Sequence, residues 1–235
     1  MTQQFIEKDD VQSVLDEYAE AASPQYHQHA EKFQNLERWT GSDPVVLVMD
    51  AAGSATGLNY KNIVKPAVEA FRDEFVDSGK VTTFEDMIEL EHDSEFEAAF
   101  RIGRPNIAYD VPGVLLENAD EEDDDLALLQ SWAENADPKR YVDDPVGAVY
   151  GIGLATFQYL RMIAGANTVK PDIQVRRFIE ELEAEHPSFD LDSSSSIAVL
   201  ESCEWLASRS TYSMIEIDQI AWWKNSGNAD LSPAH

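Results

Sequence analysis

Hydrophobic residues recur at helical rather than alternating spacing along almost the whole chain. Turn signals built from serine, glycine, aspartate and proline separate the periodic segments. We expect helices over residues 9–21, 24–38, 43–51, 60–77, 82–90, 94–101, 104–117, 125–135, 143–150, 154–164, 173–185, 195–208 and 213–225. No internal repeat is present, and the pattern predicts an all-α fold.

The segment 143–178 carries the most informative order of helix and turn signals. An aspartate can cap a short helix over 143–150 whose first position is a proline, since proline lacks the N–H that would be unpaired there. Gly151-Ile152-Gly153 then predicts a hairpin, because glycine permits sharp turns and close approach to the backbone. An apolar helix over 154–164 follows. A loop ending in Pro171-Asp172 opens the next helix.

The balance of charges is the most unusual feature of the composition. The 235 residues include 45 Asp and Glu against 17 Lys and Arg, which gives a formal net charge of −28 and an isoelectric point near 4.2. The acids are scattered along the whole chain, which favours a surface adapted to molar salt. The alternative is an acidic interaction protein or a mimic of nucleic acid. We expect the acidic run 117–125 to form a solvated loop.

Such a charge normally argues against DNA binding. At molar salt the screening length falls to about 3 Å, so the long-range repulsion from DNA is largely removed. The same salt also removes the free energy gained from counterion release, so binding has to depend on short-range contacts and base extrusion. A chain this acidic can therefore bind DNA only in a salty cell.

The segment 143–178 resembles the helix-hairpin-helix DNA glycosylase superfamily, which includes endonuclease III and the alkyladenine and oxoguanine glycosylases. That family is named for a hairpin followed by a Gly/Pro-rich loop and an aspartate, and Gly151-Ile152-Gly153 and Pro171-Asp172 fall in this order. The run from Asp172 to Phe178 is similar to the family's Asp-x-His-x-x-Arg run, with Gln174 in place of the usual histidine.

Weaker similarities extend the resemblance beyond these roughly 35 residues. Val45–Lys61 is similar to the helix and loop that open the family's six-helix barrel, and Ile217–Gly227 is similar to its last helix. The resemblance implies one two-lobed, glycosylase-like helical unit. A six-helix barrel with the hairpin would span 42–165, and residues 1–41 plus 166–235 would form the second lobe. A cleft between the lobes would hold the aspartate on one wall and the hairpin near its mouth.

The resemblance assigns catalysis to Asp172. Hydrolysis of an N-glycosidic bond builds positive charge on the deoxyribose, which a carboxylate stabilises while it orients or deprotonates a water. An aspartate at this place is also an ideal helix cap, and the two roles are compatible. Bifunctional relatives carry a lysine two residues after the second hairpin glycine, where this chain has Ala155. We therefore expect a monofunctional glycosylase without lyase activity.

The resemblance also names DNA contacts. Backbone N–H groups of the hairpin would bind a phosphate, and the carbonyls of Tyr150 and Ile152 could hold a K⁺ or Na⁺ ion; the alternative is a tight turn with no ligand. The expected DNA-binding residues are Tyr150, Gly151, Ile152, Gly153, Thr156, Lys170 and Gln174. The loop residues Leu58, Asn59 and Tyr60 are candidates to fill the hole left by an extruded base.

Other candidates have simpler readings. Lys170 suits an exposed, solvated charge, and Arg176 and Arg177 suit pairing with nearby carboxylates. Trp222 and Trp223 could stack on a base, but we expect at least one of them in the core.

The single cysteine, Cys203, excludes an internal disulfide and the four-cysteine iron–sulfur cluster that some glycosylases carry. We expect it to be a small buried residue, and we expect no cofactor beyond the possible monovalent ion. No charged-then-apolar leader opens the chain, and no uncharged run reaches the roughly 18 residues that span a bilayer. The expectation is a cytoplasmic monomer without a membrane partner.

Three functions remain open at this stage. The first is a monofunctional glycosylase that acts in base-excision repair on double-stranded DNA with a damaged or mismatched base, at high salt. The second is a non-catalytic helix-hairpin-helix module that binds DNA or a protein, favoured by Ala155, Gln174 and the acidity. The third is an acidic adaptor that no longer binds DNA. Nothing in the sequence names the base that would be excised.

Overall fold

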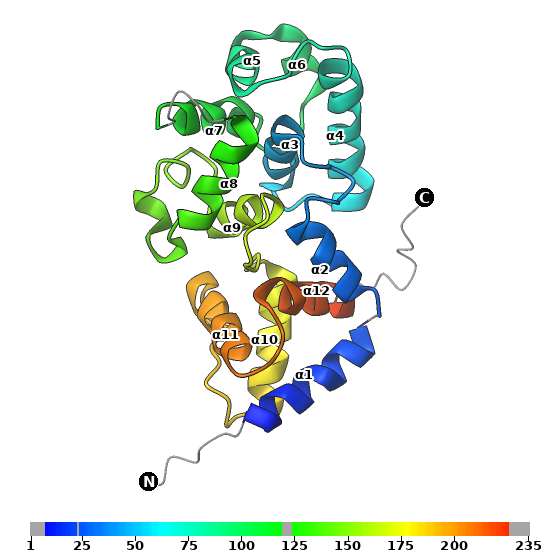
Figure 1. Cartoon of the computed structure of the whole chain (residues 1–235), viewed down its shortest axis with the longest axis vertical. Helices are drawn as coiled ribbons and strands as arrows, with labels where there is room; N and C mark the ends of the chain where they lie inside the picture. Colours follow the sequence, from blue (N-terminus) through cyan, green and yellow to red (C-terminus); the bar gives the residue numbers. More distant parts are fainter. Residues whose placement is uncertain (1–7, 23, 119–123, 226–235) are drawn as a thin grey trace. The chain divides into compact units, whose positions relative to one another are not determined.

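The computed structural model describes residues 8–22, 24–118 and 124–225 (Figure 1). These ranges contain helices, turns and loops and no β-strand, which confirms the all-α class. None of their helices is both long and apolar enough to cross a bilayer. Most of the acidic run 117–125 lies outside the described residues.

The chain folds into two units, each with its own core. Unit 1 consists of Met1–Phe33 and Asn167–His235, and unit 2 consists of Gln34–Ala166. Residues 34–41, which the resemblance assigns to the second lobe, thus belong with unit 2, where Arg38 and Trp39 form hydrogen bonds. That unit 2 is a six-helix barrel, and that the two units make one glycosylase-like whole, stays a prediction.

Unit 1 is built from the first and last helices of the chain. They are α1 (Lys8–Ala22), most of α2 (Tyr26–Gln34), α10 (Ile173–Glu185), α11 (Ser196–Ser208) and α12 (Met214–Asn225). α12 packs against α1, α10 and α11, so it is the central helix of this unit. The core includes Leu15, Phe178, Cys203 and Ile220. Cys203 is buried, as expected.

Unit 2 contains the helices from the middle of the chain. Its α-helices are α3 (Pro44–Ser54), α4 (Lys65–Phe71), α5 (Phe84–Glu89), α6 (Ser94–Ala99), α7 (Asn106–Leu116), α8 (Asp125–Asn135) and α9 (Leu154–Ile163). Its shorter helical segments are η1 (Tyr60–Val64), η2 (Arg72–Val76), η3 (Leu90–His92) and η4 (Pro138–Asp143). α3 is almost wholly buried and packs against α7, α9 and α4.

Capping side chains begin the helices where the sequence places them. Asp172 caps α10, and Asp43 caps α3 just before a proline at its first position. Ser195 caps α11, with its side chain accepting from the Ala198 N–H. Each such cap contributes on the order of 1 kcal/mol, because it pairs N–H groups that the helix leaves without a partner.

The expected helix over 143–150 is wrong. A 3₁₀ segment, η4, ends at Asp143, and turns follow up to Gly151. Asp144 does cap this stretch, since its Oδ1 accepts from the N–H of Val146 (2.9 Å). Gly147 lies against the carbonyl of Tyr141, whose oxygen is only 1.7 Å from where a Cβ would be, so this turn has room only for glycine. That close approach is a tertiary constraint that residue periodicity does not show.

Two other helices differ from expectation in form. The expected helix over 60–77 is helical, but its two ends, η1 and η2, are π-helical turns around α4. The expected helix over 24–38 ends at Gln34, because Leu36 takes a left-handed conformation (φ 55°) that a helix does not tolerate.

Candidate functional site

Asp172 lies where the loop 166–172 enters α10 and is half-buried. Its Oδ1 accepts hydrogen bonds from the N–H groups of Gln174 (2.8 Å) and Val175 (3.3 Å). Nothing in the described part of the chain donates to Oδ2. The residue is therefore a helix cap that still offers one carboxylate oxygen to solvent or a ligand.

A second carboxyl group, that of Asp218 on α12, acts on the same loop. It is buried, with 4% of the residue exposed. Its Oδ1 accepts from the Lys170 N–H (2.9 Å) and its Oδ2 from Nε2 of Gln219 (2.9 Å). Burial, and then the charge of Asp172, raise the pKa of Asp218 to about 7, against the lowering effects of Lys170 and Gln219. Two acids in different environments thus act on the start of α10: Asp172 caps the helix, and Asp218 binds the loop that leads into it.

The neighbouring predicted residues have structural roles. The backbone of Lys170 is held by Asp218, and its side chain is half-buried. Gln174 gives its carbonyl to Nδ2 of Asn225 (3.1 Å), and its Oε1 is buried without a hydrogen-bond partner among the described residues. Arg176 donates to the Ser193 carbonyl and to Oγ of Ser196 (3.5 Å), so the expected carboxylate pairing is wrong for this arginine.

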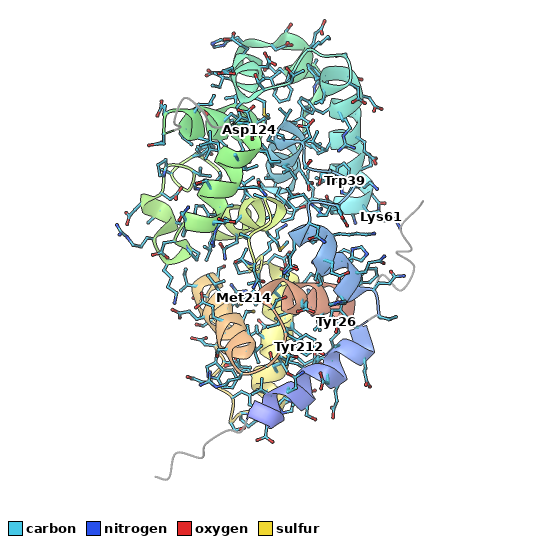
Figure 2. All side chains as sticks on the ribbon, in the orientation of Figure 1. Tyr26, Trp39, Lys61, Asp124, Tyr212 and Met214 are labelled. Carbon is cyan, nitrogen blue, oxygen red and sulfur yellow. The ribbon has the colours of Figure 1, made fainter. Side chains whose placement is uncertain are left out.

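The aromatic pair near the end of α12 is partly buried in unit 1. Trp223 is 7% exposed and meets the ring of His29 edge-on, with centroids 5.0 Å apart. This confirms that at least one of the two tryptophans packs in the core. Tyr26 and Tyr212, labelled in Figure 2, also pack together in this unit, with centroids 6.2 Å apart.

The hairpin in unit 2 is a tight turn. The N–H of Ile152 donates to the Val149 carbonyl (3.1 Å), and Gly151 has a φ of +93° that favours glycine. The carbonyl of Tyr150 accepts from Nδ2 of Asn106 (2.9 Å), which leaves one lone pair for an ion. Gly153 is exposed, and no group of the described chain accepts from its N–H. That N–H is available to a phosphate.

An exposed arginine that the sequence analysis did not single out lies beside this turn. The guanidinium of Arg104 is 5.4 Å from the centre of the Tyr150 ring, and its side chain lies about 3.1 Å from where a Cβ on Gly151 would be. Thr156, by contrast, is buried in α9 at 8% exposure. Ile152 is also buried, at 7% exposure, so Gly153 and the Tyr150 side chain are the exposed predicted contacts in this part of unit 2, and Arg104 adds a positive charge.

The loop before η1 presents two of its three predicted residues. Leu58 is 38% exposed, and Asn59 is exposed while its Oδ1 caps η1 by accepting from the Asn62 N–H (2.9 Å). The hydroxyl of Tyr60 points inward and donates to Oδ2 of Asp50 (3.0 Å). This anchoring leaves Leu58 and Asn59 as the side chains able to enter a duplex.

Asp50 is the centre of a buried polar cluster that sequence reasoning missed. Its Oδ2 accepts from Nη1 of Arg38 (3.1 Å), the Tyr60 hydroxyl and the Tyr159 hydroxyl (2.7 Å). Trp39 Nε1 donates to Tyr60 (3.0 Å), and Trp39 is labelled in Figure 2. Burial by itself lowers the pKa of Arg38, but the charges of its neighbours outweigh this and raise the pKa overall. The cluster is a charge-compensated core element.

Burial also raises the pKa of both phenols, against the lowering effect of Arg38. Tyr60 and Tyr159 therefore stay protonated and act as donors to Asp50. Oδ1 of Asp50 is buried and has no hydrogen-bond partner among the described residues. With no route from solvent to this carboxylate, which is 0% exposed, the cluster stabilises unit 2 rather than binding a ligand.

An open hollow of about 390 Å³ also lies in unit 2, between α7 and the turns before the hairpin. Its walls carry the acids Glu91, Asp110 and Glu117. Such a lining repels phosphate. Within the described residues, no three His, Cys, Asp or Glu side chains come together in a group suited to a metal ion.

Exposed large apolar side chains are few in the described ranges, and two of them, Leu58 and Tyr150, are at positions where DNA contacts are expected. Five large ones are exposed: Leu58, Ile63, Val142, Tyr150 and Ile173. Three of them belong to the loop before η1, to the hairpin and to the position after Asp172. Solvent-exposed apolar groups at such places are available to pack against bases or sugars.

No protein-family model, curated protein or solved structure matches this chain in the comparisons. The resemblance to glycosylases therefore rests on the residues quoted from the sequence.

Proposed function

We propose that the protein is a monofunctional DNA glycosylase that hydrolyses the bond between a damaged or mismatched base and its deoxyribose, with Asp172 at the reaction centre. The observation that carries the proposal is the half-buried carboxylate of Asp172, which uses one oxygen as a helix cap and keeps the other without a donor among the described residues. The cap fixes the side chain, so the second oxygen is presented in a defined direction.

The chemistry follows from this placement. As the base departs, the sugar acquires positive charge, and a fixed carboxylate stabilises that charge better than a mobile one. The same oxygen can accept a proton from the attacking water. Because Ala155 replaces a potential amine nucleophile, the reaction would end at an abasic site, with the strand uncut.

DNA contact is assigned to the surface of unit 2. The N–H of Gly153 and the guanidinium of Arg104 would bind phosphate at short range, which is the kind of contact that molar salt leaves in place. Leu58 and Asn59 would fill the space of the extruded base. The acidic surface suits a salty cytoplasm, which we propose as the setting in which a monomer acts on double-stranded DNA.

Base release from oligonucleotide duplexes tests the proposal. Duplexes carrying uracil, alkylated, oxidised or mismatched bases are incubated with the protein in molar KCl, and abasic sites are revealed by alkali. We expect Asp172→Asn to remove at least about 100-fold of the rate, as loss of a general base does. The fold should persist, because asparagine caps helices as well as aspartate does.

Asp43→Asn is the matched control. Oδ1 of Asp43 accepts from the N–H groups of Val45 (2.9 Å) and Val46 (3.3 Å), nearly the same geometry as the cap at Asp172. This variant should release base as the wild type does. Equal activity in Asp172→Asn would remove Asp172 from the mechanism. Tight binding to an abasic duplex without base release from any substrate would instead support the non-catalytic DNA-binding module.

A further inference from the structure

The loop that leads into α10 is fastened to α12 at two points. Oδ1 of Asn167 accepts from the Ile215 N–H (3.2 Å), and Oδ1 of Asp218 accepts from the Lys170 N–H (2.9 Å). The N–H of Asp172 then donates to the Lys170 carbonyl (2.6 Å). The place of Asp172 in unit 1 therefore depends on a carboxylate in the second turn of α12.

A carboxylate is more than this anchor requires. Both partners of Asp218 are donors that an amide could serve, since an asparagine oxygen would accept from Lys170 and the Gln219 amide could rotate to match. Burying a carboxylate without a cation costs free energy that an asparagine would avoid. What the carboxylate adds is a charge that interacts with Asp172.

We propose that Asp218 is a positioning residue for Asp172: its carboxylate fixes the loop through the Lys170 N–H, two residues before Asp172, and its charge is coupled to that of Asp172. The inference rests on the function proposed above. When Asp218 ionises, unit 1 presents two negative charges to the cation that develops on the sugar. Base release should therefore rise as the pH passes about 7, the pKa of Asp218.

Other ionisable groups around Asp218 do not replace this coupling. From the loop, Lys170 opposes the effect of Asp172. From α11, the Cys203 thiol is neutral, because burial, and then the charges of Asp218 and Glu204, raise its pKa. From α1, the Tyr18 hydroxyl donates to Glu185 (2.8 Å). Asp172 is the group whose charge adds to burial in raising the pKa of Asp218.

The first experiment needs no activity. The ¹³C shift of the Asp218 carboxyl is followed by NMR against pH in the wild type, in Asp172→Asn and in the control Asp43→Asn. We expect the pKa of Asp218 to fall in Asp172→Asn, where the neighbouring charge is removed, and to keep its wild-type value in Asp43→Asn. An unchanged pKa in Asp172→Asn overturns the pairing.

The second experiment measures base release under single-turnover conditions against pH. Asp218→Asn should keep the low-pH rate and lose the rise near pH 7. Asp218→Ala, which loses the anchor to Lys170 as well as the charge, should be about five- to tenfold slower than Asp218→Asn at every pH, the equivalent of one net hydrogen bond. A rise that persists in Asp218→Asn overturns the inference. If the wild type releases no base, the proposed function fails, and the NMR titration still decides whether the two carboxyls are coupled.

Discussion

Among the described residues, each unit buries one aspartate in its core, and the two are held in opposite ways. Asp50 in unit 2 accepts hydrogen bonds from a guanidinium and two phenol hydroxyls, so its charge is compensated by the adjacent arginine. Asp218 in unit 1 meets a backbone N–H and an amide, and its charged neighbours include another carboxylate. The first arrangement places a cation directly on the aspartate, whereas the second raises the pKa of Asp218 and so favours a proton on it.

This difference suits Asp50 to a structural role and Asp218 to a role beside the proposed reaction centre. The Arg38–Asp50 ion pair is compensated and its carboxylate is 0% exposed, so it is out of reach of a substrate. The acid pair of unit 1 is open on one side, because Asp172 is half-buried while Asp218 is not exposed. A carboxyl whose pKa is raised by burial and by a neighbouring charge, as that of Asp218 is, is typical of reaction centres.

Removing the cation of the closed cluster is the sharpest way to test its role. Arg38→Met should destabilise unit 2 by about 3–5 kcal/mol, because it leaves the charge of Asp50 buried without compensation. Native-state hydrogen exchange of the α3 and α9 amides measures the loss. Arg140→Met is the matched control, since Arg140 pairs with Asp143 at the surface (3.3 Å) and should cost less than about 1 kcal/mol. Equal effects of the two variants would show that the cluster does not support the core.

Much of the fold follows from local signals. Twelve of the thirteen expected helices exist, because amphipathic spacing and capping side chains act within a few residues. The segment 143–150 forms turns in which Gly147 packs on the Tyr141 carbonyl, and α2 ends before the left-handed backbone of Leu36. Contacts of that kind depend on tertiary packing, which the spacing of apolar residues does not encode.

The second prediction concerns the buried carboxyl of Asp218. The pKa of Asp218 is raised in the folded state, so the folded protein binds this proton more tightly than the unfolded chain does. The free energy of unfolding that this proton contributes is fully present below about pH 4. It is lost as the pH rises through about 7. The loss amounts to at most about 4 kcal/mol. Asp218→Asn lacks it and should gain stability relative to the wild type between pH 4 and pH 8. Urea unfolding at fixed KCl measures this, and a difference independent of pH would contradict it.

The candidate site was only partly readable from the sequence. Asp172 could be found because a capping aspartate after a proline is a local signal, and its cap is present. Asp218 and Asp50 could not, since their partners come from distant segments. The sequence did contain a signal, because each aspartate interrupts an apolar run, in IDQIAWW and VVLVMDAAG. An aspartate within such a run is expected to be buried, which is rare for this residue unless it has a partner. Arg104 gave no such signal, because only the folded chain brings it to the hairpin.

The smallest expected effects separate the shape of the hairpin from its use. Gly151→Ala should cost about 1–2 kcal/mol, because its φ of +93° is unfavourable for alanine and the new methyl would press on Arg104. Gly153→Ala should leave stability almost unchanged, since this residue has an extended backbone (φ −99°, ψ 173°) and no atom lies within 4 Å of the added Cβ.

Binding to DNA should give a different result for the same two positions. A methyl on the exposed Gly153 stands where a phosphate would approach its N–H, so Gly153→Ala should weaken binding to an abasic duplex several-fold without loss of fold. Fluorescence anisotropy in molar KCl measures the affinity, with melting curves to compare stability. If Gly153→Ala binds as the wild type does, the hairpin is a turn and nothing more, and the surface through which unit 2 meets DNA has to be sought around Leu58 and Asn59 instead.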